Sequence, residues 1–186
     1  MKNICVKLSQ HENNKYRKML SSEETIFPEF APETASTSPY TPGAAIQDDD
    51  WFCITNAGSK DYSIDLLSES FSTVDMDSLT RAEFGKIDYL FVVDDRFIYF
   101  QNVSKSKLVS QKRIVHFGEE FTYKTNCAEI VIKDLPDAIY DKNTDNLYFR
   151  RLESITSIFR GMDMLYREAT QEETDTFLAS DFISLK

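Results

Sequence analysis

Histidine and cysteine are scarce in this sequence, and their positions exclude the common sites that depend on them. The chain of 186 residues has two histidines, His11 and His116, and three cysteines, Cys5, Cys53 and Cys127. No CxxC pair occurs, which argues against zinc-ribbon and thioredoxin-like sites. Neither histidine has an obvious nucleophile or metal ligand as a neighbour in the sequence. We expect three reduced, mostly buried thiols and two histidines without a catalytic role.

Long apolar runs, glycine and proline are also scarce. No apolar run approaches the ~20 residues that a membrane-spanning helix needs, and the N-terminal residues MKNICVKL are too polar for a secretory signal. A glycine-rich phosphate loop, HExxH and GxSxG are all missing. With only 5 Gly and 5 Pro, a loop-dominated scaffold is disfavoured. The sequence therefore predicts a cytoplasmic protein with no cofactor, no metal and no direct membrane insertion, and it gives no positive sign of enzymatic activity.

Aromatic residues are abundant instead. They make up 13% of the chain, with 14 Phe and 9 Tyr, and hydrophobic residues make up 41%. This composition supports a real core and favours a sheet-rich interior. We predict a strand and a weak helix in residues 1–27, a Pro/Ser/Thr-rich linker or long loop in residues 28–50, and an α+β domain in residues 51–186.

Apolar patterns predict a series of short strands. These strands cover residues 3–8, 51–55, 87–93, 96–101, 111–117, 120–124, 129–133 and 146–150. Turn-forming residues separate them, including Asp94 and Asp95 between two apolar runs, so we expect an antiparallel meander. Residues 10–24 and 78–86 are predicted to be helical.

The C-terminal part has helical periodicity. Apolar residues recur at three- and four-residue spacing between positions 152 and 166, and we expect Gly161 to weaken or kink this helix. Thr170 and Glu173 match a capping box, which predicts the start of a second helix. The predicted fold is therefore α+β, a twisted antiparallel meander of five to seven strands with two C-terminal helices packed on one face.

A basic stretch at residues 96–118 stands out from an acidic chain. The whole chain has 21 Lys and Arg against 31 Asp and Glu, a net charge of -10. The stretch contains no acidic residue, so the remainder has 16 basic residues against 31 acidic ones. Its five basic residues, which we name the basic strip, are Arg96, Lys105, Lys107, Lys112 and Arg113.

Aromatic residues lie within the same stretch. In an extended strand Phe97 and Tyr99 face one side, and Ile98 and Phe100 face the other. One pair must face the core, and the other could stack on bases or pack beneath a helix. A basic strip with aromatic neighbours predicts non-catalytic, salt-dependent binding of DNA or binding of an acidic protein surface. A solvated charged face without a function is the third interpretation.

The acidic residues support a different hypothesis. A protein of net charge -10 can bind a basic nucleic-acid-handling protein in place of DNA and inhibit it. Acidic clusters at residues 48–50, 134–145 and 168–175 would provide the carboxylates. The sequence leaves open whether the protein forms a homo-oligomer.

A metal-dependent nuclease that uses Asp88, Asp94 or Glu129 is a weaker alternative. Restriction-type nuclease sites need a lysine two positions after the second acidic residue. Asp137 offers the first half of such a motif, but no lysine follows Lys142 until Lys186. The nuclease hypothesis therefore lacks half of its motif.

Short motifs in the C-terminal two-thirds are similar to a known family. They are IDY (87–89), FQNVSKS (100–106), DAIY (137–140), LYFR (147–150), IFRG (158–161) and LYREAT (165–170). Together they resemble the bacterial domain of unknown function in the B subunit of the Kiwa anti-phage system, over residues 60–186. The resemblance implies a cytoplasmic phage-defence protein that acts beside a membrane-embedded subunit and engages DNA, with no enzymatic site to carry over. The basic strip overlaps the second motif.

Overall fold

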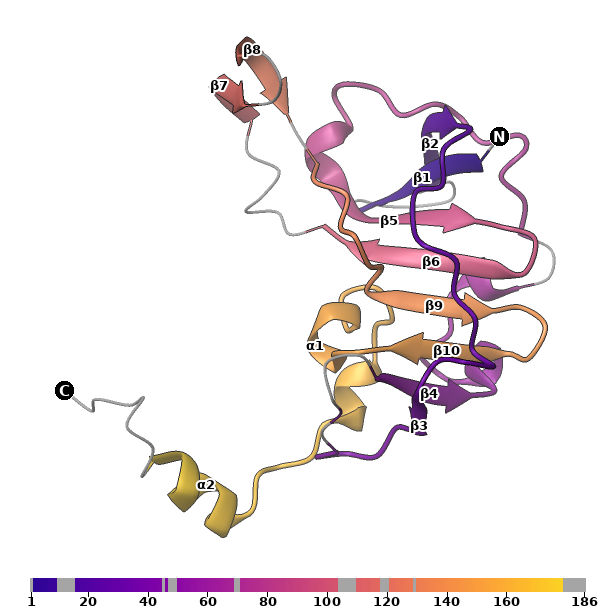
Figure 1. Cartoon of the computed structure of the whole chain (residues 1–186), viewed down its shortest axis with the longest axis vertical. Coiled ribbons are helices and arrows are strands. Elements are labelled where there is room, and N and C mark those ends of the chain that lie inside the picture. Colours follow the sequence, from indigo (N-terminus) through magenta and orange to yellow (C-terminus); the bar gives the residue numbers. More distant parts are fainter. Residues whose placement is uncertain are drawn as a thin grey trace.

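Among the described residues, eight strands form one open sheet and two form a separate hairpin (Figure 1). The computed structural model of the chain describes residues 2–9, 16–44, 46, 50–68, 71–103, 110–117, 121–128 and 130–178, with the backbone alone at 110–117, 121–128 and 177–178. The strands are β1 (Lys2–Leu8), β2 (Tyr16–Ser22), β3 (Thr37–Pro39), β4 (Trp51–Thr55), β5 (Ile87–Val93), β6 (Phe97–Asn102), β7 (Ser110–Phe117), β8 (Phe121–Ala128), β9 (Ala138–Asp141) and β10 (Asn146–Phe149). The helices are α1 (Leu152–Ile155) and α2 (Gln171–Leu178), with short 3-10 turns at η1 (Ala57–Ser59), η2 (Asp65–Leu67), η3 (Phe84–Lys86) and η5 (Met162–Leu165).

The large sheet is mostly antiparallel, which confirms the predicted α+β class. Its order is β2-β1-β5-β6-β9-β10-β4-β3, and only the β3–β4 pair is parallel. β6 pairs with β9, so strands on either side of the β7–β8 hairpin are neighbours in the sheet. The sequence predicted an α+β domain limited to residues 51–186, whereas residues 2–22 contribute β1 and β2 to the same sheet.

Both faces of the central strands are buried. β5 is a nearly continuous apolar run, IDYLFVV, which is typical of a strand covered on two sides. In β6, Phe97 and Tyr99 belong to one core cluster, and Ile98 and Phe100 belong to the other. Each of these four side chains is at most 7% exposed. The interpretation that one pair stacks on bases is therefore wrong, because both pairs belong to the core.

The Pro-rich segment covers one face of the sheet. After β2 the chain crosses in front of the central strands before it reaches β3 (Figure 1). Phe27 stacks on Tyr99 with ring centroids 5.8 Å apart, and Phe30 lies 5.0 Å from the ring of Tyr148. The described part of the predicted linker is thus a loop that buries an aromatic side chain, interrupted by the short strand β3.

The chain after β10 covers the other face, but with less helix than its periodicity predicts. α1 is a single turn, and Gly161 at φ +99° separates it from the 3-10 turn η5. α1 ends at Ile155 and turns follow, so the single helix that the sequence predicted, weakened or kinked at Gly161, is instead two short helical segments with Gly161 directly before the second. The apolar residues Ile155 and Phe159 still reach the core, and Phe159 packs edge-on against Phe100 at 5.3 Å.

The second predicted helix exists, but its described side chains do not pack on the sheet. The capping box is confirmed: the Glu173 N–H donates to Thr170 Oγ1 (3.3 Å), and the Thr170 N–H donates to Glu173 Oε2 (2.8 Å). Of residues 171–176, only Thr174 is half-buried and the rest are exposed. This part of α2 reads QEETDT and has no apolar side chain to bury, so the expectation of two packed helices holds only for α1.

Several local predictions differ from the structure. Tyr16–Ser22 forms β2 where a weak helix was predicted over residues 10–24, because pairing with β1 overrides the low strand propensity of this polar segment. In residues 78–86, predicted to be helical, Ser78 makes an isolated bridge to Lys18, and a turn at 81–83 leads into η3. Residues 130–133 are not a strand, although 129–133 was predicted as one. The four-residue strand β9 was not predicted, since it is too short for a clear alternating pattern.

Candidate functional site

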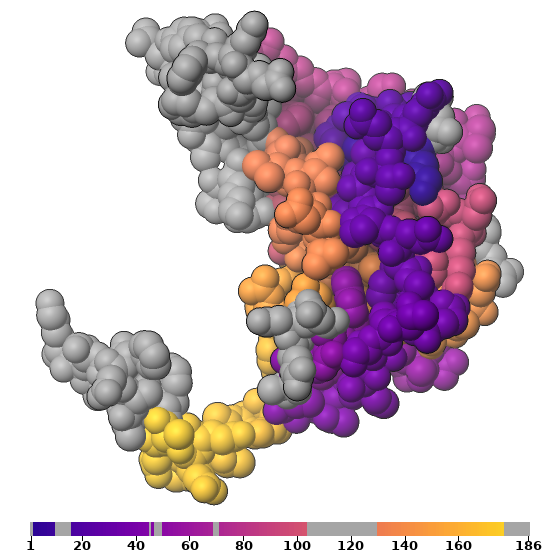
Figure 2. Space-filling model, in the orientation of Figure 1, coloured from indigo at the N-terminus to yellow at the C-terminus, as the bar shows by residue number. Residues whose placement is uncertain are grey.

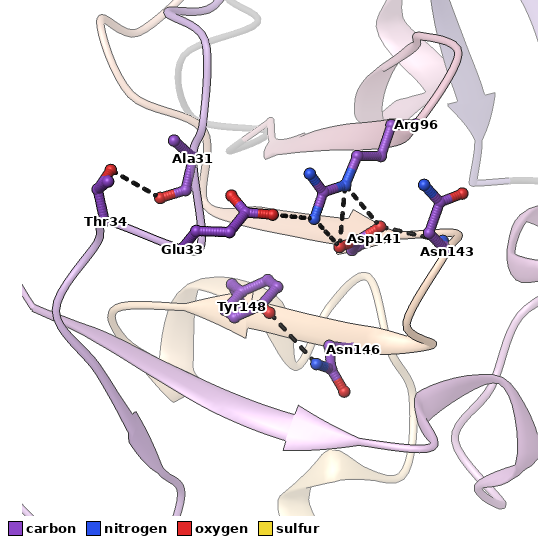
Figure 3. Close-up of polar contacts among 8 residues, drawn as sticks. All are labelled: Ala31, Glu33, Thr34, Arg96, Asp141, Asn143, Asn146 and Tyr148. Carbon is purple, nitrogen blue, oxygen red and sulfur yellow. Dashed lines mark hydrogen bonds and ion pairs between the residues drawn. The ribbon is translucent and has the colours of Figure 1, made fainter.

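Arg96 of the basic strip lies in an ion cluster (Figure 3). It follows Asp94 and Asp95 in the turn between β5 and β6, and its guanidinium reaches the carboxylate of Asp141 at the end of β9. The Nε atom donates to both Asp141 oxygens at 3.2 Å, and Nη2 donates to Asp141 Oδ2 at 2.8 Å. Nη2 also donates to Glu33 Oε1 in the Pro-rich segment at 2.7 Å.

The carboxylate of Asp141 is fully buried and stays ionised because of its donors. Burial opposes its ionisation, but hydrogen bonds from Arg96 and from the Asn143 N–H (3.0 Å) outweigh burial and lower its pKa. Hydrogen bonds to Asp141 and Glu33 raise the pKa of Arg96. The guanidinium also lies 4.7 Å from the centroid of the Phe97 ring. Arg96 therefore holds β9 and the Pro-rich segment to the β5–β6 turn and is not an open docking cation.

The other basic-strip residues lie between β6 and β9, in residues 104–129, which we name the β7–β8 arm. Lys112 and Arg113 are successive residues of β7, and Arg113 pairs with Thr125 of β8. Lys105 and Lys107 lie outside the described residues. The β7–β8 hairpin is a sheet of its own and stands apart from the eight-stranded sheet in Figure 1.

The residues that flank the β7–β8 arm are held together on the large sheet. The buried side chain of Gln101 in β6 donates from Nε2 to the Val131 carbonyl (2.8 Å) and accepts at Oε1 from the Lys133 N–H (2.9 Å). Asp137 accepts from the Asn102 N–H at 2.8 Å and pairs with Lys133 Nζ at 2.7 Å. The chain therefore leaves the sheet after β6 and returns beside its point of departure.

The sequence reasoning missed Gln101, Asp137 and Asp141 as organising residues. One signal was available for Gln101, because it is a polar residue in the buried strand FIYFQN, and buried polar groups need partners. No sequence signal identified its partners, since Val131 and Lys133 are 30 and 32 residues away in the chain.

The candidate catalytic residues do not converge in the described structure. His116 pairs with Thr122 in the β7–β8 hairpin, and His11 lies outside the described residues, as does Glu129. Asp88 and Asp94 lie near opposite ends of β5, about 20 Å apart at the usual strand rise. Within the described ranges, no group of three or more His, Cys, Asp or Glu side chains could hold a metal ion.

Each of these two carboxylates has basic partners of its own. Asp88 Oδ2 lies 3.6 Å from Lys7 Nζ and 3.9 Å from Arg160 Nη2. Asp94 accepts from Lys2 Nζ and from the Asp95 N–H, and the hydrogen bond from Lys2 is the main cause of its lowered pKa. Asp88 and Asp94 therefore pair separately with basic residues of β1 and with Arg160, and they do not form one acidic centre.

Several carboxylates of the predicted acidic clusters also have structural roles. Asp137 and Asp141 have the partners described above, and Asp145 Oδ1 accepts from the Gly58 N–H (2.7 Å) and the Tyr140 hydroxyl (3.0 Å). Glu173 pairs with Arg167 at 2.5 Å, and this hydrogen bond is the main cause that lowers its pKa to about 2. Asp48 and Asp49 lie outside the described residues.

Comparisons of the chain with models of protein families, with curated proteins and with solved structures give no match. In the part of the chain that the structure describes, no helix is both long and apolar enough to cross a membrane.

Proposed function

We propose that this protein binds double-stranded DNA through the β7–β8 arm and acts as a non-catalytic component of anti-phage defence in the cytoplasm. The observation that carries the proposal is the combination of charge and shape in one segment. The β7–β8 arm has five basic and three acidic residues, while the rest of the chain has 16 basic and 28 acidic residues. This basic segment forms a two-stranded antiparallel ribbon outside the large sheet.

The shape of the arm favours DNA over an acidic protein surface. The major groove of B-DNA admits a two-stranded β-ribbon, and several DNA-binding proteins use strands in this way. The basic residues of the β7–β8 arm are Lys105, Lys107, Lys112, Arg113 and Lys124. Each cation that neutralises a phosphate releases counterions, so DNA binding would be strongly dependent on salt. The rest of the protein outside the β7–β8 arm, which we name the body, is acidic, so it would repel DNA and confine contact to the arm.

The role in defence rests on the motifs at 87–89, 100–106, 137–140, 147–150, 158–161 and 165–170. These motifs are similar to the B-subunit domain of the Kiwa system, and FQNVSKS leads directly into the β7–β8 arm. A membrane-embedded partner subunit belongs to the same proposal.

Fluorescence anisotropy with a labelled 20-base-pair duplex tests the proposed function. In the test variant Lys105, Lys107, Lys112 and Arg113 are changed to Glu. Loss of four phosphate contacts should weaken binding at least about 100-fold near 0.1 M salt. The melting temperature should stay the same, since none of the four is part of the described core and Lys112 and Arg113 belong to the separate β7–β8 hairpin.

The control changes four exposed basic residues elsewhere, Lys60, Arg81, Lys86 and Arg160, to Glu. It alters the net charge equally and should reduce binding far less. Equal loss in both variants would mean that net charge alone controls binding. If the wild type does not bind DNA at low salt, the proposal fails, and capture of a basic partner would favour the acidic-inhibitor alternative.

A further inference from the structure

A cleft of about 1130 Å³ opens beside the large sheet. It lies between parts of the chain that are distant in sequence, on the side that is hollowed in Figure 2 between the orange connector before β9 and the yellow segment before α2. Its walls come from the end of the Pro-rich segment, the connector 133–137, residues 150–154 after β10, and residues 166–174. No sequence motif indicated this cleft, because its walls are brought together only by the fold.

Specific contacts hold the walls of the cleft together. The Tyr40 hydroxyl donates to the Leu165 carbonyl at 3.2 Å, which links the Pro-rich segment to the turn before α2. Arg167 packs onto Gly43 so closely that a Cβ atom there would lie 2.7 Å from its Nη2 atom. The same Nη2 atom pairs with Glu173 of α2 at 2.5 Å. The cleft is therefore built by packing and is more than a gap between loops.

Four basic residues line the cleft, and two of them are available to a ligand. Lys133 is paired with Asp137, and Arg167 is paired with Glu173. Arg151 is 75% exposed and has a single long contact of 3.9 Å to Glu153. Arg150 is half-buried and has no hydrogen bond or ion pair among the described residues. Two adjacent guanidiniums with unused donors favour a carboxylate or phosphate.

The cleft also has an apolar wall that the protein itself leaves uncovered. Tyr166 is 51% exposed and Leu135 is 41% exposed, although most large apolar side chains that the structure describes are buried. Ala44 and Ile46 also line the cleft. Apolar side chains exposed in a cleft beside cations with unused donors are characteristic of a binding site.

We propose that this cleft binds a short extended peptide of a partner protein, in which a carboxylate side chain lies next to an apolar side chain. The carboxylate contacts Arg150 and Arg151, and the apolar side chain packs against Leu135 and Tyr166. This binding activity is additional to the proposed contact of the β7–β8 arm with DNA and does not depend on it.

The lining favours a peptide over a nucleotide for two reasons. Asp137, Glu153 and Glu173 also line the cleft, and they would repel the several charges of a phosphate chain. The uncovered wall is largely aliphatic, with Tyr166 as its one well-exposed aromatic ring, whereas sites for bases use aromatic stacking. A peptide with one carboxylate beside an apolar side chain complements both the two guanidiniums and the uncovered apolar wall.

Selection of random hexapeptides displayed on a carrier, with the full-length protein as bait, tests this inference. We expect the recovered peptides to share an Asp or Glu next to Leu, Ile, Val or Phe. The most enriched peptide is then titrated by calorimetry against the wild type and against a variant that combines Arg150→Ala with Arg151→Ala. The loss of charge-assisted hydrogen bonds should weaken binding roughly 10- to 100-fold.

Arg160→Ala is the matched control, because Arg160 is 76% exposed and does not line the cleft. This control should bind the peptide as the wild type does, and both variants should keep the wild-type melting temperature and the DNA affinity of the β7–β8 arm. The inference is overturned if no peptide is enriched, if the shared pattern lacks an acidic residue, or if the double variant binds equally well. Tighter binding of ATP than of any peptide, dependent on Arg150 and Arg151, would overturn it in favour of a nucleotide site.

Discussion

At the residue scale, one ion cluster shows how the fold uses its charges. Asp141 is buried and has Arg96 as its ion-pair partner, whereas Glu33 is 62% exposed and contributes only a surface pair. Breaking a buried pair leaves an uncompensated charge, while an exposed pair is worth about 0–1 kcal/mol. The two partners of Arg96 should therefore differ widely in their effect on stability.

Arg96→Met should lower the free energy of unfolding by about 3 kcal/mol, because it leaves the Asp141 carboxylate buried without its cation. Glu33→Gln should lower it far less, because the exposed Glu33–Arg96 pair is screened by solvent. Urea denaturation followed by circular dichroism measures both. Similar losses in the two variants would contradict the assignment of Asp141 as the buried partner.

The same cluster predicts the pH dependence of stability. The folded pKa of Asp141 is lowered, so its contribution is complete above the unfolded value of about 3.9 and is lost as the pH falls through the folded pKa. Asp141→Asn should therefore be less stable than the wild type at pH 7, and the difference should shrink below about pH 4. Parallel stability curves for the two proteins between pH 7 and pH 3 would show that Asp141 does not titrate as the structure requires.

At the element scale, α2 depends on local contacts rather than on the core. Its first turn is held by the capping box of Thr170 and Glu173 and by the Arg167–Glu173 pair. The described side chains of α2 are mostly exposed, so packing contributes little to this turn. A short helix of this kind forms and opens without unfolding the sheet.

Thr170→Ala should destabilise α2 locally by about 1 kcal/mol, since it removes the acceptor for the Glu173 N–H. Amide hydrogen exchange at residues 173–174 should become several times faster. Exchange in β5 and β6 and the melting temperature of the protein should not change. Thr156→Ala is a suitable control, because its hydroxyl donates to the Glu153 carbonyl at the end of α1 and has no capping role in α2.

At the scale of the whole molecule, the body and the β7–β8 arm are separable. The body has a core on each face of one sheet, and the arm is a second sheet. The contacts of Gln101 with residues 131 and 133 hold the segments that flank the arm side by side. Insertions whose ends lie close together can be removed without opening the structure that carries them.

Replacement of residues 104–129 by a short Gly-Ser linker should therefore give a folded protein. The shift in melting temperature should be less than about 3 °C, which corresponds to about 1 kcal/mol for a chain of this size. DNA binding should be lost, and selection of peptides by the cleft should be retained. Loss of the cooperative melting transition would show that the arm contributes to the core.

The sequence by itself determined the α+β class, the strands at β4, β5, β6, β7 and β10, and the capping box of α2. These features depend on neighbouring residues, through apolar runs, turn formers and local hydrogen bonds, so one-dimensional patterns are sufficient for them. The charge contrast between the β7–β8 arm and the rest of the chain is likewise a property of the sequence.

Only the tertiary structure decided the remaining points. Pairing with β1 made a strand of the polar segment Tyr16–Ser22, and burial on both faces placed Phe97 and Tyr99 in the core. A long-range contact pairs Arg96 with Asp141, so Arg96 is not available for docking as the rest of the basic strip is proposed to be. Other long-range contacts bring Arg150 and Tyr166 together in one cleft. Each of these outcomes depends on partners far away in the chain, whose proximity is fixed by the energy of the folded state as a whole and is not encoded in any local pattern.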